Sequence, residues 1–564
     1  MKQKAVEILK KSLKKIEVDW KEENIEKIIE IPSNPEMGDY AFPCFLVAKE
    51  IKNNPQQIAL NIRKEIGNPP EEFEEIQAVG PYVNFFINKK NLALMLISKY
   101  KEKKKKVESK NSEKIMVEFP SPNTNKPLHL GHLRNISIGE SISRILEFKG
   151  NKVIRANLYN DRGIHICKSM AAYKKYGKNK IPKKNEKGDH FVGHYYVLFN
   201  KNEKKDVKLE LESHRLLQKW EEGDSESREL WKKMNSWAYE GFQETFKKLN
   251  VNFDKIYYES KLYKEGKDII LDGVKKGVFQ REKDNSVSVN LGKKLGKKIL
   301  LRSDGTSVYI TQDIYLAKKK FEEYKLNKSL YVVGNEQEHH FETLFKILEM
   351  LKIADISKLK HLSYGMVELP EGKMKSREGT VVDADDLIEK IQKMVKKDLE
   401  ERYKLPKKEI EKRSLKITIA AIKYMLLKVD TKKNMIFNPK ESISFEGDTG
   451  PYLLYSYARA NSILKKAKKN YDFNNVGKIN DKDKDLIAKM AFAEKIIDEA
   501  YDKLNPSIIA KYAYELSQIF NEFYHSSKII GNENEDFKLG LVYTFKKILK
   551  ICLDLLGIEA LEEM

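Results

Sequence analysis

The residues best suited to chemistry form a short motif, His129-Leu130-Gly131-His132, directly before a helix-periodic stretch. Unpaired amide groups at a helix start attract phosphate, and imidazoles can donate hydrogen bonds to phosphate oxygens. Gly131 would let a planar base approach the backbone. The motif therefore predicts a nucleotide-triphosphate site. An isolated H-x-x-H is ordinarily a pair of structural histidines, and a metal site would lack a third ligand.

A second motif is the glycine-bounded basic loop Gly372-Lys373-Met374-Lys375-Ser376-Arg377-Glu378-Gly379-Thr380. Alone, such a charge run is usually a solvated turn. Behind the last strand of a sheet, however, it can bring cations over a nucleotide and stabilise charge as a phosphate bond breaks. The order and context of the two motifs make the nucleotide prediction specific.

Each of the two motifs follows a predicted strand of a strand-helix-strand unit. The predicted strands and helices of these units are 115–119, 133–148, 153–159, 330–333, 341–351 and 362–369. Two such units predict an α/β fold with a parallel, doubly wound, Rossmann-like sheet. The histidine motif then follows the first strand of the sheet.

Changes in composition along the chain predict three domains. The polar run 101–114, with four consecutive lysines at 103–106, is typical of a linker. We therefore expect an α+β N-terminal domain at 1–110 and a catalytic sheet domain at 111–385, with a mostly helical insertion around 170–300. Residues 386–564 show helix-period apolar positions and no convincing strand, which predicts an all-α domain.

The overall composition limits the classes of protein. The chain has 564 residues, of which 41% are hydrophobic and 34% charged, so a mainly disordered polymer and a single small module are excluded. Its net charge of +22 favours a polyanionic partner such as nucleic acid. The basic residues are 93 lysines and only 13 arginines, a skew that weakens this argument.

Three cysteines, Cys44, Cys167 and Cys552, lie far apart and predict neither a disulfide framework nor a thiolate zinc site. Eighteen consecutive apolar residues occur nowhere, so we expect no membrane span and a cytoplasmic protein.

With both motifs in place, the chain resembles a class I aminoacyl-tRNA synthetase, and His129 to His132 and Lys373 to Arg377 correspond to the HIGH and KMSKS signatures of that class. Further segments resemble the arginyl-tRNA synthetases in particular. These segments are 117–126, 301–306 with Tyr309 and Asp313, 333–337, 445–452 and 555–558. The resemblance runs from about residue 80 to the C-terminus and is weakest in 170–250.

The resemblance implies ATP-dependent activation of L-arginine followed by transfer to the terminal adenosine of tRNA(Arg). It implies catalytic roles for His129, His132 and Lys373, and an ATP site formed by His129, Gly131, His132, Lys373, Met374, Lys375, Ser376 and Arg377. The arginine pocket would be formed by Glu118, Ser121, Asn123, Tyr309, Asp313 and Gln337, with Tyr309 and Asp313 nearest the guanidinium. Carboxylate and carbonyl acceptors suit this planar cation. Mg²⁺ would accompany the ATP phosphates, with no dedicated cluster of metal ligands in the sequence.

The basic loop departs from the common signature, because Ser376 stands where that signature has its second lysine. Lys126, three residues before His129, is our candidate for the missing charge, acting from the opposite side of the nucleotide. We therefore add Lys126 to the catalytic residues.

The flanking domains imply a tRNA partner, with the N-terminal domain at the tRNA elbow and the helical domain at the anticodon. Tyr455, Tyr457 and Arg459 on one helix could stack on splayed bases, although packing within the helical core explains such spacing equally well. Asn84 is a candidate contact in the N-terminal domain. We expect a monomer.

Three alternatives remain open on the sequence alone. One is a class I synthetase for another amino acid, above all lysine, which lacks a planar fork. Another is a catalytically silent tRNA-binding relative. The third, a small-substrate nucleotidyltransferase, leaves the helical domain without a purpose.

Overall fold

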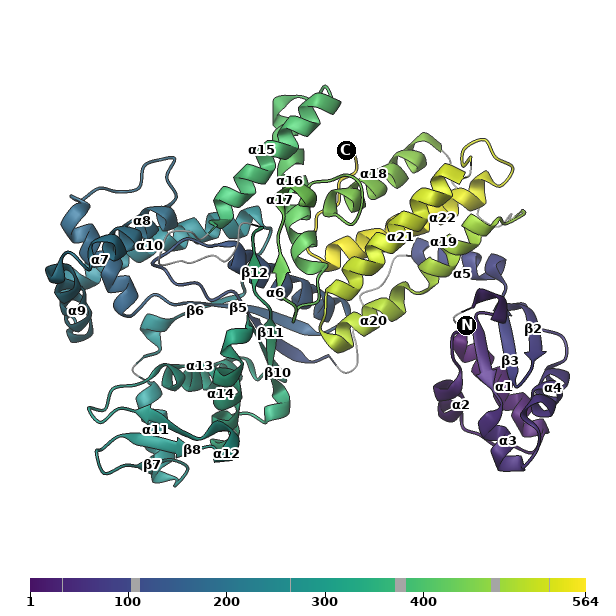
Figure 1. The fold of residues 1–564 in the computed structure, drawn as a ribbon, viewed down its shortest axis with the longest axis horizontal. Helices are drawn as coiled ribbons and strands as arrows, with labels where there is room; N and C mark the ends of the chain where they lie inside the picture. The colour runs from purple at the N-terminus through teal and green to yellow at the C-terminus, as the bar shows by residue number, and fades with distance from the viewer. Residues whose placement is uncertain (33, 103–111, 264, 371–381, 468–476, 527) are drawn as a thin grey trace. The chain divides into compact units, whose positions relative to one another are not determined.

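The computed structural model describes the chain except residues 33, 103–111, 264, 371–381, 468–476 and 527 (Figure 1). The predicted loop residues Lys373 to Arg377 therefore lie outside the described residues. Internal contacts divide the chain into two compact units. The first unit is Met1–Lys104, Ala460–Glu494 and Leu516–Ile548; the second is Lys105–Arg459, Lys495–Glu515 and Leu549–Met564.

The N-terminal part of the first unit is α+β, as predicted. Its three-stranded antiparallel sheet has the order β1-β3-β2. Its elements are α1 (Lys2–Lys15), α2 (Glu22–Ile28), the 3-10 helix η1 (Pro35–Met37), β1 (Tyr40–Pro43), α3 (Phe45–Ile51), α4 (Pro55–Ile66), β2 (Phe73–Val79), β3 (Tyr82–Ile87) and α5 (Lys89–Lys101). In α1 the helix-spaced side chains of Val6, Leu9 and Leu13 are fully buried, so the amphipathic pattern forms one side of this core.

The second unit is built on a five-stranded sheet of order β11-β10-β4-β5-β6, and all four pairings are parallel. Its strands are β4 (Lys114–Glu118), β5 (Lys152–Tyr159), β6 (Lys255–Tyr258), β10 (Lys328–Gly334) and β11 (Leu359–Tyr364). Residues 115–117 are almost completely buried, because helices cover both faces of such a sheet. The predicted Rossmann-like architecture is confirmed.

Helices α6 (Leu130–Phe148), α13 (Tyr309–Tyr324) and α14 (Glu338–Met350) pack around this sheet. The predicted strand 362–369 was wrong in one respect, because the chain leaves the sheet after Tyr364. At Gly365 a Cβ atom would lie 2.5 Å from the Lys433 backbone, and the carbonyl of Gly365 accepts a hydrogen bond from the fully buried Arg134. Those contacts turn the chain into a separate strand, β12 (Val367–Glu368).

The inserted segment is helical at first and then contains strands. Its helices are α7 (Ile164–Tyr176), α8 (Gly188–Asn202), α9 (Val207–Glu222) and α10 (Ser225–Lys248). After β6 come η2 (Glu259–Lys261), α11 (Gly266–Lys275), α12 (Gly292–Leu295) and an antiparallel sheet of β7 (Gln280–Arg281), β8 (Val287–Asn290) and β9 (Lys297–Leu301). Residues 170–300 are thus mostly helical up to residue 248, and beyond it short strands accompany the helices. The strands there have only two to five residues each, which is too short to show a strand period in the sequence.

The C-terminal region is helical, as predicted, apart from one two-residue strand. Its helices are α15 (Ala384–Arg402), α16 (Lys407–Leu427), α17 (Pro439–Ser442), α18 (Gly450–Ala467), α19 (Asp481–Ala491), α20 (Ala493–Lys503), α21 (Ser507–Ser526) and α22 (Glu535–Leu555). The expectation of no strand after 386 was wrong, because β13 (Met435–Ile436) pairs in parallel with β12. Two residues are too few to show a strand period in the sequence.

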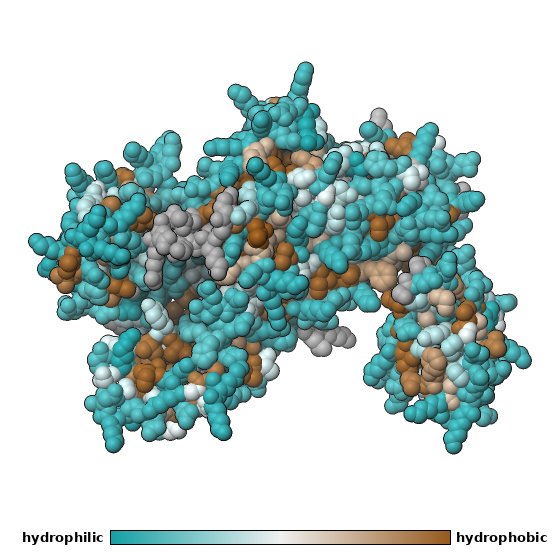
Figure 2. Space-filling model, viewed as in Figure 1, coloured by the Kyte–Doolittle hydropathy of each residue, from teal (hydrophilic) through white to brown (hydrophobic). Residues whose placement is uncertain are grey.

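The surface agrees with the lysine-rich composition. Figure 2 shows hydrophilic residues over most of the visible face, with apolar residues in scattered groups. Among the described residues, no helix has both the length and the apolar character needed to cross a membrane.

Candidate active site

The histidine motif forms the turn that begins α6. His129 is the N-cap residue of this helix, and its backbone N–H donates a 3.1 Å hydrogen bond to Nδ1 of His132. The two imidazole ring centroids lie 3.9 Å apart. Because Nδ1 of His132 accepts a hydrogen bond, the neutral ring carries its proton on Nε2. His132 thus retains a donor at Nε2 beside a helix N-terminus, where anions bind.

Backbone pairing fixes this turn against the chain that enters α15. The N–H of Leu130 donates to the carbonyl of Val382 at 3.1 Å, and the N–H of Ala384 donates to the carbonyl of Leu128 at 2.9 Å. These bonds place His129 opposite Asp383 in an isolated bridge. The first residues after the predicted basic loop therefore hold the histidine turn.

The electrostatics of the turn leave its histidines neutral and one lysine unpaired. Burial, with repulsion from Lys126, lowers the pKa of His129 to about 4 despite the opposing effect of Asp383. Burial, with repulsion from His129 and Lys126, holds the pKa of His132 well below its usual value. Burial also lowers the pKa of Lys126, whose ammonium has no hydrogen bond or ion pair within the described part of the chain. A partly buried cation without a counter-charge is suited to binding an anion.

The lowered pKa of His129 predicts a pH dependence of stability. Between about pH 6.5 and pH 4 the unfolded chain binds more protons at this residue than the folded chain, so stability falls as the pH falls. We expect His129 to account for about 2 kcal/mol of the stability lost between about pH 7 and pH 4.5. Urea unfolding at both pH values should therefore show a smaller loss for His129→Gln than for the unchanged protein. Equal losses would contradict the assigned neutral state.

Gly131 has a packing role in the turn. A Cβ atom there would lie 3.0 Å from Cε1 and 3.1 Å from Nδ1 of His129, so the ring would have to shift by a few tenths of an ångström. Gly131→Ala should raise the KM for ATP about fivefold through this displacement. The same change should not lower stability, because alanine is the better helix former by up to about 1 kcal/mol. A variant with an unchanged KM would show that the His129 ring position does not matter.

The loop that carries Ser121 and Asn123 is attached to the end of β5. The side-chain carbonyl of Asn157 accepts from the N–H of Ser121 at 3.2 Å, and the side-chain amide of Asn160 donates to the Ser121 carbonyl at 2.9 Å. Asn123 pairs with Asn160 in an isolated parallel bridge. The carboxyl ends of β4 and β5 therefore hold this loop at the edge where such sheets bind ligands.

Glu118, the last residue of β4, is engaged in a buried ion pair. Its carboxylate contacts the ammonium of Lys320 on α13, a residue with no exposed surface. Burial disfavours the charged lysine, but Glu118 outweighs it and raises the pKa of Lys320. The same ammonium lies 4.6 Å from the ring centroid of Tyr331, which pairs with Glu118 across β4 and β10. Glu118 thus already has a protein cation as its partner.

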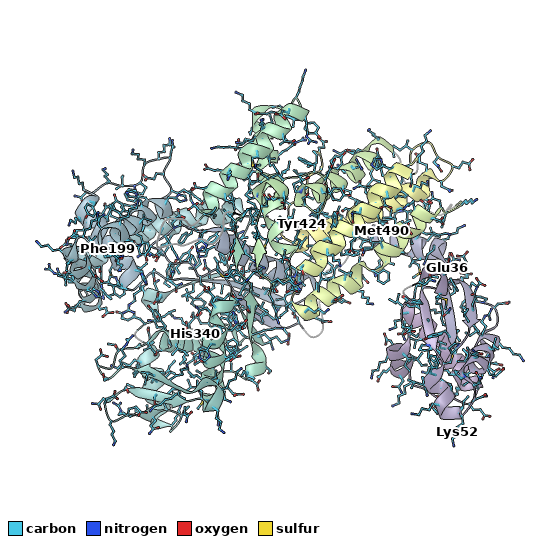
Figure 3. The ribbon with its side chains drawn as sticks, in the orientation of Figure 1. Glu36, Lys52, Phe199, His340, Tyr424 and Met490 are labelled. Carbon is cyan, nitrogen blue, oxygen red and sulfur yellow. The ribbon has the colours of Figure 1, made fainter. Side chains whose placement is uncertain are left out.

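The remaining predicted pocket residues stand at the N-terminal end of α13 and just after β10. Tyr309 begins α13 and is 75% exposed, and Gln337 ends the 3-10 helix η3 (Asn335–Gln337) and is exposed. Asp313 is about one third exposed and forms a 2.7 Å contact with Nε2 of His340, a residue labelled in Figure 3. That hydrogen bond raises the pKa of His340. Asp313 and Glu118 both act electrostatically on Lys320, which places them in one neighbourhood.

Sequence reasoning missed three residues of this region: Lys320, His340 and Glu259. Burial, Asp161 and Asp313 together raise the pKa of Glu259 to about 7, against the effect of Arg162. Lys320 is one of several lysines on α13, and Glu259 follows the strand β6 in a segment predicted to be mostly helical. His340 stands three residues after Gln337, just beyond the segment 333–337 that carries the resemblance, and this proximity was the available signal.

The predicted tRNA-contacting residues have mixed surroundings. On α18, the guanidinium of Arg459 donates to the Tyr455 hydroxyl at 2.8 Å and lies 4.6 Å from its ring centroid. Tyr457 is buried and donates to Glu562, so its ring belongs to the helical core. Asn84 on β3 is also buried, and its amide atoms make no hydrogen bond within the described residues.

The fold and the site together define a class I aminoacyl-tRNA synthetase. A parallel five-stranded sheet carries the histidine turn after its central strand, and residues 93–439 match the family described as tRNA synthetases class I (R), catalytic domain. Residues 3–87 match the arginyl tRNA synthetase N terminal domain, and residues 453–564 match the DALR anticodon binding domain.

Similarity to individual proteins shows which family within this class the chain belongs to. The chain is 45% identical over 559 residues to the arginine–tRNA ligase of Treponema denticola, covering 95% of this chain and 94% of that protein. It is 44% identical to the Phocaeicola vulgatus arginine–tRNA ligase, covering 93% and 94%. The structure of Thermus thermophilus arginyl-tRNA synthetase matches with a TM-score of 0.78 at 25% identity over all of both chains. The chain belongs to the arginyl-tRNA synthetase family.

Proposed function

We propose that this protein activates L-arginine with ATP to arginyl-adenylate and transfers the arginyl group to the 3′-terminal adenosine of tRNA(Arg). The observation that carries the proposal is the turn at the start of α6. There two neutral histidines lie at the N-terminus of the helix, with the unpaired Lys126 close to both rings. Family membership supplies arginine and tRNA as the substrates.

In the first step a carboxylate oxygen of arginine attacks the α-phosphorus of ATP. The bond from the α-phosphorus to the bridging oxygen breaks, and pyrophosphate leaves with the electron pair. This step requires little general acid or base, so positioning and charge stabilisation dominate it. His132 donates from Nε2 to a phosphate oxygen, and Lys126 supplies positive charge beside the histidine turn. Mg²⁺, bound through phosphate oxygens and water, would neutralise the triphosphate.

Recognition of arginine relies on acceptors at the carboxyl ends of β4 and β10 and at the start of α13. Asp313 keeps Oδ1 for the guanidinium while Oδ2 contacts His340. Glu118 keeps Oε1 for a substrate amino group while Oε2 contacts Lys320. Ser121, Asn123, Tyr309 and Gln337 complete the proposed pocket. The ammonium of lysine has no planar fork of N–H donors, so it would leave some of the acceptors proposed for the guanidinium without a hydrogen bond.

Amino-acid-dependent exchange of pyrophosphate into ATP tests this function. Arginine and lysine are each supplied with and without tRNA. Exchange with arginine and not with lysine is expected. Exchange with lysine would show that lysine, and not arginine, is the amino-acid substrate. Binding of tRNA without any exchange would favour a catalytically silent relative. The requirement for tRNA in the arginine reaction shows whether the two substrates are coupled.

For the tRNA contacts we propose Tyr455 and Arg459 on α18, with Asn84 in the N-terminal domain. Tyr457 would have to leave its buried contact with Glu562 before it could stack on a base. We further propose that the enzyme is cytoplasmic and monomeric. Light scattering would then give the mass of a single chain.

A further inference from the structure

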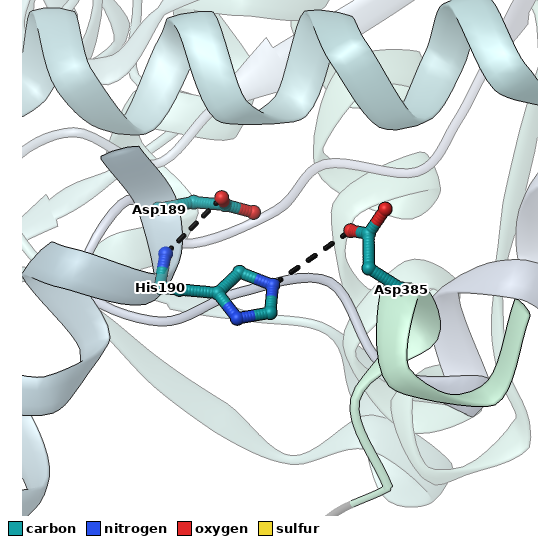
Figure 4. Close-up of side chains that lie close together, drawn as sticks. All are labelled: Asp189, His190 and Asp385. Atoms are coloured by element: carbon teal, nitrogen blue, oxygen red, sulfur yellow. Dashed lines mark hydrogen bonds and ion pairs between the residues drawn. The ribbon is translucent and has the colours of Figure 1, made fainter. Parts of the chain in front are cut away.

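A group of charged side chains joins the start of α8 to the start of α15, outside the arginine pocket. Nε2 of His190 lies 3.3 Å from Oδ1 of Asp383 and 3.8 Å from Oδ2 of Asp385. The backbone N–H of His190 also donates to Asp189 at 3.1 Å. Figure 4 shows the His190 ring directed from α8 toward Asp385 at the start of α15. These contacts attach the helical insertion to the chain segment that pairs with the histidine turn.

Two carboxylates of this group, Asp385 and Asp189, have lysine ammonium groups as partners. Lys187 donates to Asp385 at 2.5 Å and to Asp189 at 3.4 Å, and Lys248 donates to Asp385 at 2.8 Å. Among the described residues, two overlapping sets have a spacing that could hold a metal ion: Asp189, His190 and Asp385, and His190, Asp383 and Asp386. In the first set two lysine ammonium groups already contact the carboxylates, and in the second the Asp383 oxygen nearest His190 is the N-cap acceptor of α15. An ion-pair network is therefore the better explanation than a cation site.

Asp383 differs from its neighbours because neither lysine contacts it. One of its oxygens accepts from the N–H groups of Asp385 and Asp386 as the N-cap of α15, at 2.8 and 3.2 Å. The other oxygen, Oδ2, is buried and has no hydrogen bond within the described residues. His190 is the only cationic side chain recorded in an ion pair with Asp383 in the described part of the chain.

Asp383 also lies beside the proposed triphosphate site. Its backbone is bridged to His129, and its charge opposes the lowering of the His129 pKa. An uncompensated carboxylate at this position would repel the phosphates of ATP. A cation that remains on Asp383 removes this repulsion and keeps the N-cap in place.

We propose that His190 is a positioning residue for ATP, whose imidazolium neutralises and holds Asp383 beside the histidine turn. The inference rests on the proposed function, because it takes the histidine turn as the triphosphate site. Burial disfavours the charged ring, but Asp383, Asp385 and Asp189 outweigh it and raise the pKa of His190 to about 10, so His190 is cationic at neutral pH. His190 itself contacts neither substrate in this arrangement.

The test compares His190→Gln with two compensating variants in arginine-dependent pyrophosphate exchange, with tRNA present. His190→Gln should raise the KM for ATP about tenfold, as expected for the loss of one charge-assisted contact. The KM for arginine should change less than about twofold, because neither His190 nor Asp383 has a recorded ion pair or side-chain hydrogen bond with a proposed pocket residue in the described part of the chain. His190→Lys should restore the KM for ATP to within about threefold of the unchanged protein, because it restores the charge.

Asp383→Asn in the His190→Gln background separates charge from packing. Asparagine keeps the N-cap and removes the negative charge, so the double variant should bind ATP better than His190→Gln alone. His214→Gln is the matched control, because His214 is an exposed histidine on α9 in the same insertion. It should leave both KM values unchanged.

Two results would overturn the inference. One is an unchanged KM for ATP in His190→Gln, and the other is a double variant no better than His190→Gln, which would indicate a packing role. Failure of the proposed function is a different result, because the unchanged protein would then show no arginine-dependent exchange. Equilibrium binding of ATP, measured by calorimetry on the same variants, gives a second readout that does not need turnover.

Discussion

Lys126→Met is expected to slow arginine-dependent pyrophosphate exchange about a hundredfold, the usual cost of removing one preorganised group that stabilises transition-state charge. At neutral pH His129 and His132 are neutral, so they offer hydrogen bonds without charge. The ammonium of Lys126 has no counter-charge within the described residues. Methionine keeps the length of the side chain and removes the charge, and the loss should appear mainly in kcat.

Lys152→Met serves as the control for this prediction. Lys152 is an exposed lysine at the start of β5 and should tolerate the change without effect on exchange. Lys126→Arg should retain part of the activity, because it keeps the charge with a different geometry. Near-normal arginine activation by Lys126→Ala or Lys126→Met would show that the charge missing at Ser376 is not supplied by Lys126.

The sequence predicted the helices and strands that have a sustained apolar pattern and the turns that separate them. Residues 115–119 form a mostly apolar run that is buried within a parallel sheet, a pattern that predicts such a strand. Residues 153–159 were predicted as a strand although Arg155 and Asn157 interrupt their apolar pattern. The strand β6 was not predicted, because it has only four residues, Lys255-Ile256-Tyr257-Tyr258, and lies in a mostly helical segment. It forms an edge of the sheet. Its place at the sheet edge depends on pairing with β5, a contact about a hundred residues away in the sequence.

The candidate site was predictable where local sequence determines it. The turn at His129 follows from a glycine-containing helix start after a strand, and the structure has that turn. Partners across the fold were not predictable: nothing local to Asp383 indicates that His190 contacts it, and nothing local to Lys320 indicates Glu118. Such pairs depend on which helices pack together, and a lysine-rich chain offers many candidates for each carboxylate.

Lys320→Met is the second large effect that we expect, and it acts on stability. The substitution would leave the carboxylate of Glu118 buried without its cation, and breaking a buried pair by removing one partner costs about 3–5 kcal/mol. Urea unfolding of the variant and of the unchanged protein measures this loss. Lys319→Met is the matched control, because Lys319 is the adjacent lysine on α13 and its i,i+4 contact with Glu323 is partly exposed. A loss below about 1 kcal/mol for Lys320→Met would contradict the pairing.

The double variant Lys320→Met with Glu118→Gln distinguishes a structural from a substrate-binding role of Glu118. Both buried charges are then removed together, so most of the lost stability should return. If Glu118 only balances Lys320, arginine activation should return with it. If Oε1 of Glu118 also accepts a hydrogen bond from the substrate cation, the KM for arginine should stay about tenfold or more above that of the unchanged protein, because a neutral amide is the weaker acceptor. We expect the second result, since the carboxylate stands at the end of β4, where parallel sheets bind their ligands, and only one of its oxygens is needed by Lys320.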